Sequence, residues 1–165
     1  MQTKIFYEEK IFSKWLIGIL ATITVILLFL FFYQILSGPI GTNPAPNWLL
    51  LFMFLLFLGI MINFSILTIR MTSGYISVGY GIIKHSILWE NIEDCYLDNA
   101  STIRYGGWGI RIAKVKGKWR LVYNVIGGQC IVLSLKKGRF KEFVFSTGNP
   151  EQVIKLAKEQ IDRIK

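Results

Sequence analysis

Two long stretches without charged side chains dominate the hydropathy pattern of the chain. They span residues 15–36 and 48–69, and no Asp, Glu, Lys, Arg or His falls between Lys14 and Arg70. About 20 apolar residues in a helix cross the ~30 Å hydrocarbon core of a bilayer, and in lipid only a helix satisfies the backbone polar groups of such a run. Neither run shows the polar edge that is usual for a core helix of a soluble protein. The pattern therefore predicts two transmembrane helices.

A connector rich in turn-forming residues, at positions 37–47, separates the two runs. Pro39, Pro44 and Pro46 stand there with Gly38 and Gly41. Proline and glycine end helices and favour tight turns. The connector therefore predicts a short loop that joins the two helices into a hairpin.

Basic residues flank the two runs and are missing from the connector. Lys4, Lys10 and Lys14 precede the first run, and Arg70 follows the second. Because cytoplasmic flanks are enriched in Lys and Arg, we expect a multi-pass protein of the cytoplasmic membrane with both termini in the cytoplasm. The absence of ionisable side chains within the runs argues against a transport pathway. The expected organisation is a cytoplasmic N-terminal segment at 1–14, transmembrane helices at 15–36 and 48–69, an external loop at 37–47, and a cytoplasmic domain at 70–165.

After residue 69 the pattern becomes strand-like. Short β-branched and aromatic runs separated by glycine turns predict an antiparallel meander of about seven strands. These runs lie at residues 75–78, 82–89, 92–97, 103–113, 119–125, 130–135 and 140–146. From Asn149 the period changes, and a helix cap followed by Pro150 predicts an amphipathic C-terminal helix. Its expected apolar face comprises Val153, Ile154, Ala157, Ile161 and Ile164.

A family resemblance rests on four segments of this domain. The motif Tyr105-Gly-Gly-Trp-Gly-Ile-Arg111, residues 123–128, residues 131–135 and Thr147-Gly-Asn-Pro-Glu151 resemble the pleckstrin-homology-like (PH-like) domains of bacteria and archaea. In particular, they resemble those of a group of small two-pass membrane proteins. Residues 6–12 fit that group too, whereas residues 114–120 look longer and more basic than its pattern.

The resemblance covers nearly the whole chain. It implies an α+β membrane protein in which a transmembrane helical hairpin precedes a PH-like antiparallel β-barrel or sandwich with a C-terminal amphipathic helix. It implies no activity and no ligand site.

Basic side chains carry the main functional signal. The chain has a net charge of +9, nearly all of it after residue 69. Lys114, Lys116, Lys118 and Arg120 alternate and would share one face of an extended segment. An anionic leaflet attracts each nearby Lys or Arg by ~1 kcal/mol. Solubility and membrane topology explain the same charge equally well. A second basic group surrounds a turn and comprises Lys136, Lys137, Arg139 and Lys141.

A candidate groove for a small ligand is expected at Trp108 and Arg111, beside the glycines of the motif. Those glycines continue into a strand, so they indicate a structural twist rather than a phosphate loop. The first hairpin of the domain, residues 75–87, offers only Lys84 as a cation. Specific phosphoinositide recognition is therefore not expected.

The residue types that usually perform catalysis are sparse. The one histidine, His85, follows Lys84 in an alternating strand, and we expect it to face solvent. Cys95 and Cys130 have no metal or redox spacing and are expected to be reduced and partly buried. Four acids fall in one segment and predict a solvated edge or pairing with the basic strands. They are Glu90, Glu93, Asp94 and Asp98.

These observations favour a non-enzymatic membrane protein without metal or cofactor. It would present a basic PH-like module at the cytoplasmic membrane face to anionic lipid headgroups, to a protein partner or to a second copy of itself. A small-ligand sensor or an accessory subunit of a membrane complex is the alternative. Nucleic acid is not expected as a partner, because the module is tethered to a bilayer.

Overall fold

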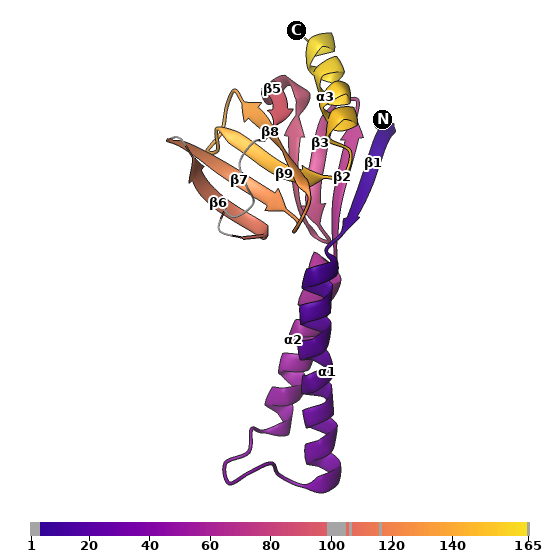
Figure 1. The fold of residues 1–165 in the computed structure, drawn as a ribbon, viewed down its shortest axis with the longest axis vertical. Coiled ribbons are helices and arrows are strands. Elements are labelled where there is room, and N and C mark those ends of the chain that lie inside the picture. The colour runs from indigo at the N-terminus through magenta and orange to yellow at the C-terminus, as the bar shows by residue number, and fades with distance from the viewer. Residues whose placement is uncertain (1–3, 99–104, 106, 116, 165) are drawn as a thin grey trace. The chain divides into compact units, whose positions relative to one another are not determined.

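The computed structural model describes residues 4–98, 105, 107–115 and 117–164 (Figure 1). The chain forms two compact units. One, called here the helical unit, comprises Ser13–Ser65, and the other, the β unit, comprises the residues before and after it. In its described residues the chain is α+β, with two sheets, two apolar helices and a C-terminal helix.

Two helices make up the helical unit. Helix α1 spans Lys14–Ser37 and helix α2 spans Asn47–Phe64, and they pack against each other. Both are long and apolar enough to cross a membrane, which suggests membrane association. Gln34 Nε2 donates to the carbonyl of Ala45 at 2.7 Å and to Asn47 Oδ1 at 2.6 Å. These bonds fix the connector to the end of α1.

The second apolar helix is shorter than the hydropathy pattern predicts. It ends at Phe64, and strand β2 begins at Ile66, so residues 66–69 are strand rather than helix. The reason is tertiary: Leu67 and Ile69 are fully buried in the β unit and pair with a neighbouring strand on each side. Hydropathy alone does not distinguish an apolar strand from the end of an apolar helix.

The first sheet contains four antiparallel strands in sequence order. Its edge strand β1 comes from the segment that precedes α1, and Phe12 at its end pairs with Ile66 at the start of β2. The N-terminal segment is therefore part of the β unit and not a separate tail. The four strands are β1 (Ile5–Phe12), β2 (Ile66–Thr72), β3 (Tyr75–Tyr80) and β4 (Ile83–Leu88).

The second sheet follows a short 3₁₀ turn, η1 (Trp89–Asn91), and is not a meander. The strand order is β5-β8-β9-β7-β6, and β7 pairs in parallel with β9. The expectation of a simple meander is wrong here, because alternation specifies strands but not their partners. Residues 103–104 of an expected strand lie outside the described residues, and that strand begins at Gly109. The strands are β5 (Ile92–Leu97), β6 (Gly109–Val115), β7 (Lys118–Asn124), β8 (Gln129–Leu135) and β9 (Glu142–Thr147).

The core lies between the two sheets. Tyr80 of β3 stacks on Tyr123 of β7 with ring centroids 6.4 Å apart, and Phe143 and Phe145 of β9 are fully buried. Helix α3 (Pro150–Ile164) packs against β5, η1 and β8. Three residues of its predicted apolar face are confirmed as buried, namely Val153, Ala157 and Ile161.

Candidate functional site

A groove opens in the β unit between β4 with η1 and the turn that joins β8 to β9. Its volume is about 700 Å³. The second basic group of the sequence supplies three of its described lining residues, Lys136, Lys137 and Arg139. Ile87, Leu88, Leu135 and Phe140 supply apolar walls. We call this feature the basic groove.

Asn91 holds the basic turn in place. Its Nδ2 donates to the carbonyl of Lys137 at 3.0 Å, and its Oδ1 accepts from the Lys137 backbone N–H at 2.8 Å. The Lys136 N–H also donates to the Asn91 carbonyl at 2.9 Å. Gly138 has a φ of 121°, which L side chains rarely adopt. The backbone that carries the lysines is therefore fixed, while their side chains extend into water.

The electrostatics of the basic groove favour an anionic occupant. Three cations face one carboxylate, that of Glu90, among the described lining residues. The Arg139 guanidinium lies 5.7 Å from the centre of the Phe140 ring, so charge and apolar surface occur side by side. Leu88 adds an exposed apolar side chain. An acidic group flanked by an apolar or aromatic one fits such a lining.

His85 lines the basic groove and differs from its expectation. It is half-buried rather than solvent-facing, with its ring centre 5.2 Å from that of Phe143. Burial lowers the pKa of its imidazole, so the side chain is neutral at pH 7. His85 therefore contributes a polar wall to the groove and no charge.

The other four cations predicted to share a face do not form one surface. This first basic group comprises Lys114, Lys116, Lys118 and Arg120. The chain turns between β6 and β7, so Lys114 pairs with Trp119 while Lys118 pairs with Val115 on the opposite face of the hairpin. Lys114 lies 5.6 Å from the Trp119 ring centre. Lys116 lies outside the described residues. The expectation of an extended face from 114 to 120 is wrong because a hairpin turn interrupts the alternation.

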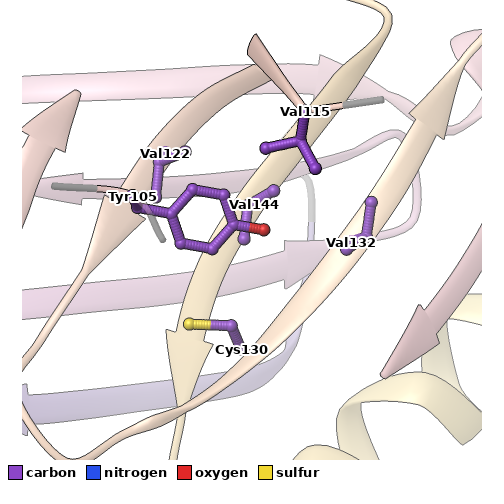
Figure 2. Close-up of a cluster of buried hydrophobic side chains, with 6 residues drawn as sticks. All are labelled: Tyr105, Val115, Val122, Cys130, Val132 and Val144. Atoms are coloured by element: carbon purple, nitrogen blue, oxygen red, sulfur yellow. The ribbon is translucent and has the colours of Figure 1, made fainter. Parts of the chain in front are cut away.

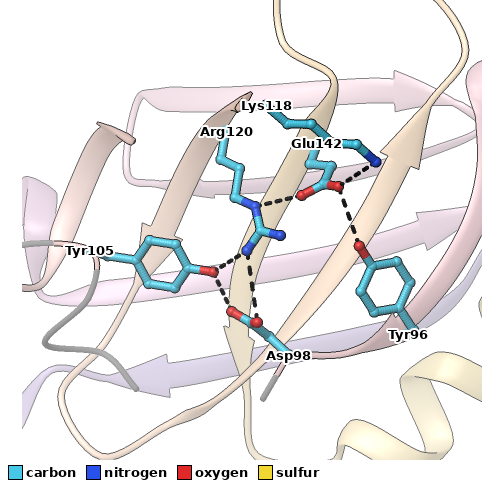
Figure 3. A network of polar contacts seen from close by, with 6 residues as sticks. All are labelled: Tyr96, Asp98, Tyr105, Lys118, Arg120 and Glu142. Carbon is cyan, nitrogen blue, oxygen red and sulfur yellow. Dashed lines mark hydrogen bonds and ion pairs between the residues drawn. The ribbon is translucent and has the colours of Figure 1, made fainter. Parts of the chain in front are cut away.

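Arg120 lies in a buried polar network and not on the surface (Figure 3). Its Nε lies 2.5 Å from Glu142 Oε2, and only 2% of the Glu142 side chain is exposed. Arg120 Nη1 donates to the Tyr105 hydroxyl at 2.6 Å and lies 3.8 Å from Asp98 Oδ1. The Tyr105 hydroxyl in turn donates to Asp98. Asp98 thus pairs with a basic strand, which was one of the two expectations for the acidic segment.

The outer ends of the network reach less buried residues. Lys118 Nζ lies 3.2 Å from Glu142 Oε1, and the Tyr96 hydroxyl donates to the same oxygen at 3.4 Å (Figure 3). Burial, followed by the hydrogen bond to the Asp98 carboxylate, raises the pKa of Tyr105. The phenol therefore stays protonated and keeps donating.

A small hydrophobic cluster packs beside this network (Figure 2). Arg120 pairs with Glu142, and two residues further along the same strands Val122 pairs with Val144. The charged pair and the valines therefore share one face of the second sheet. The network and the cluster together hold Asp98 and Tyr105 against that face, which is a structural role. The cluster comprises Tyr105, Val115, Val122, Cys130, Val132 and Val144.

A second polar cluster, which the sequence did not reveal, links the two ends of the β unit's chain. Glu9 of β1 accepts hydrogen bonds from Thr147 Oγ1 at 2.6 Å, from the Gly148 N–H at 2.7 Å and from the Tyr7 hydroxyl at 2.8 Å. Burial and the neighbouring carboxylate raise the pKa of Tyr7 to about 12. Strand β1 is thereby fixed to the segment that leads into α3.

Other sequence candidates lie apart from the basic groove. Arg111 Nε donates to the Trp108 carbonyl at 3.1 Å, and neither residue lines the groove. Lys141 belongs to the same turn but is not among the described lining residues. Cys95 and Cys130 are unpaired thiols as expected, and both are buried rather than partly buried. Among the described residues, no group of three His, Cys, Asp or Glu side chains is placed to hold a metal ion.

Comparisons with protein-family models, with curated proteins and with solved structures find no match to this chain.

Proposed function

We propose that this chain is a non-enzymatic two-pass membrane protein whose PH-like β unit binds an acidic segment of a partner protein through the basic groove. The observation that carries the proposal is the groove itself: three cations on a fixed turn, beside apolar walls, in a volume of about 700 Å³. The carboxylates of an extended acidic segment would pair with the three cations, and an apolar side chain of the same segment would pack against the apolar walls.

The membrane setting is supported by the two apolar helices and by the way they connect to the β unit. The residue before the helical unit, Phe12, and the residue after it, Ile66, are paired in the first sheet. Both connections therefore leave the β unit at one point, which supports a topology with the two termini on the same side of a bilayer. Lys10, Lys14 and Arg70 near these connections favour the cytoplasmic side.

A protein partner fits the position of the groove better than a lipid headgroup does. Strand β4 begins at Ile83, near that point of connection, and ends at Leu88 in the groove. Strand β2 starts at the connection and spans ~20 Å before reaching the level of Leu88. The basic groove therefore lies at the end of the first sheet opposite Phe12 and Ile66, where the chain passes to and from the apolar helices.

The test measures binding of a defined probe to the full chain in nanodiscs of neutral phosphatidylcholine. The probe is a fluorescent synthetic peptide with alternating glutamate and phenylalanine. A triple charge reversal, Lys136→Glu with Lys137→Glu and Arg139→Glu, should lower its affinity at least tenfold, with a strong salt dependence in the unmodified protein.

The matched control reverses three exposed cations that do not line the groove, Lys114, Lys155 and Lys158. It makes the same change in net charge and should leave the affinity for the peptide within about twofold. Salt weakens electrostatic attraction between exposed charges beyond ~10 Å, and none of the three control residues lines the groove. Equal loss in both variants would show attraction to net charge only and would contradict the groove. Enhanced binding of the unmodified chain to phosphatidylglycerol vesicles, lost in the first variant, would instead favour a lipid partner.

A small-ligand sensor is the second candidate, because the groove volume lies within the range of small-molecule sites. Its occupant would be a compact polyanion. Thermal unfolding of the full chain with added citrate or inorganic phosphate tests it: a rise in Tm that the triple reversal removes would support this candidate, and no rise would count against it.

A further inference from the structure

Four exposed apolar side chains gather at one end of the β unit. Ile82 in the turn between β3 and β4 is 90% exposed, and Phe12 at the end of β1 is 57% exposed. Ile126, in the turn between β7 and β8, and Trp108, just before β6, are 38% and 40% exposed. We call this feature the apolar end.

Strand register places these residues together. In the first sheet Phe12 pairs with Ile66. Leu67, which follows Ile66, pairs with Tyr80, the last residue of β3 before the turn that contains Ile82. The Tyr80 hydroxyl donates to the carbonyl of Asn124 at 2.7 Å, which brings the end of β7 to the same level.

The second sheet contributes its two residues from the same level. Asn124 pairs with Gly109 at the start of β6, and its Nδ2 donates to the Gly107 carbonyl at 2.9 Å. Trp108 lies between those two glycines, and Ile126 follows Asn124 by two residues. The turns after β3 and β7 and the end of β1 lie at one end of the β unit in Figure 1.

The apolar end is also where the chain leaves for the apolar helices. A single residue, Ser13, separates Phe12 from α1, and Ser65 separates α2 from Ile66. Exposed Lys10 on β1 and Lys84 on β4 lie close to this level. Apolar side chains with lysines close by match a membrane interface, where rings and aliphatic groups enter the acyl boundary and ammonium groups meet phosphates.

From this placement we propose that the apolar end of the β unit is embedded in the lipid headgroup layer, with Ile82 as the deepest side chain of the four. This inference rests on the proposed membrane insertion of α1 and α2 and adds a second, peripheral contact with the bilayer. It gives the β unit a fixed orientation, with the basic groove directed toward the aqueous phase.

The experiment uses the full chain in nanodiscs of phosphatidylcholine and phosphatidylglycerol, with a nitroxide spin label on a single introduced cysteine. The labelled variant is Ile82→Cys and the matched control is Leu88→Cys. Both positions are exposed, and they lie in the turn before β4 and at the opposite end of β4. Cys95 and Cys130 are buried, so the unmodified chain serves as the blank.

Collision rates with molecular oxygen and with a water-soluble nickel complex report the depth of each label. We expect the label at residue 82 to collide several-fold more with oxygen relative to nickel than the label at residue 88. Equal ratios at the two positions, or a label at 82 that is fully open to nickel, would overturn the inference.

A third label separates failure of this inference from failure of the proposed function. Leu55→Cys lies in the middle of α2 and should give the highest oxygen ratio. A label at 55 that is buried in lipid, together with a label at 82 that is open to water, would overturn only the proposed lipid contact of the apolar end. An aqueous label at 55 would overturn the membrane insertion, and the present inference with it.

Discussion

At the scale of single residues, the pair Arg120–Glu142 shows how burial changes the role of a charged side chain. Both side chains are almost completely buried, at 8% and 2% exposure. A charge in such a place requires a partner, because removing it from water costs several kcal/mol. Arg120 therefore serves the fold, whereas the cations of the basic groove are exposed to solvent.

The variant Arg120→Met should lower the free energy of unfolding by about 3 kcal/mol, because it leaves a buried carboxylate without its main counter-charge. Denaturant unfolding followed by tryptophan fluorescence measures the change. Lys118→Met is the control: it touches the same carboxylate from an exposed position and should cost less than about 1 kcal/mol.

The double variant Arg120→Met with Glu142→Leu should be more stable than Arg120→Met alone, because it removes the uncompensated carboxylate and fills the space with an apolar group. If the double variant lowered the free energy of unfolding by the sum of the two single-variant decreases, the two side chains would act independently.

At the scale of elements, strand β1 has a role in the first sheet that its local sequence pattern does not predict. It is separated from the first apolar helix by one residue, yet it completes the first sheet and contacts the segment that leads into α3 through Glu9. An edge strand contributes only one ladder of hydrogen bonds, so a specific side-chain anchor strengthens its attachment. The carboxylate of Glu9 provides that anchor.

Glu9→Ala should destabilise the β unit by about 1.5–3 kcal/mol, the usual range for hydrogen bonds to a charged group. Hydrogen exchange should show faster exchange at the β1 amides and little change in β8. Glu8→Ala is the neighbouring control and should have a smaller effect, because Glu8 forms ion pairs with the partly exposed side chains of Arg70 and Lys10. Equal exchange changes for the two variants would contradict the anchoring role.

At the scale of the whole molecule, the covalent path decides the topology. The chain leaves the β unit at Phe12 and returns at Ile66, its partner in the sheet. Two apolar helices lie between these points. If both helices cross a bilayer, the β unit must hold both termini on one side, and the connector between α1 and α2 must lie on the other.

Cysteine labelling of intact cells checks this topology. Thr42→Cys in the connector should react with a membrane-impermeant maleimide in intact cells, and Lys155→Cys on α3 should react only after permeabilisation. The two native thiols give a low background, because burial raises the pKa of Cys95 to about 12 and Cys130 is also buried. Labelling of Lys155→Cys in intact cells would contradict the cytoplasmic placement.

The predictions from sequence succeeded where a signal is local. Two apolar helices and strands at most of the expected positions follow from hydropathy and period, and the structure contains them. Of the five residues predicted for the apolar face of α3, three are buried, whereas Ile164 is exposed. The basic turn at residues 136–139 is also a local feature. The prediction was wrong where strands had to choose partners, as in the parallel pairing of β7 with β9.

The long apolar segments, the strand-forming segments, the amphipathic helix and the sign of the charge can all be predicted from the amino-acid sequence, because each depends on residues close together in the chain. Tertiary structure alone decided which cations are buried and which line the groove. It also decided that the N-terminal segment is a strand and that residues 66–69 leave the helix. Each of these outcomes depends on contacts between distant residues, such as Arg120 with Glu142 and Phe12 with Ile66. Such contacts leave no periodic signal in the chain, and the burial energy that fixes them exists only once the sheets have formed.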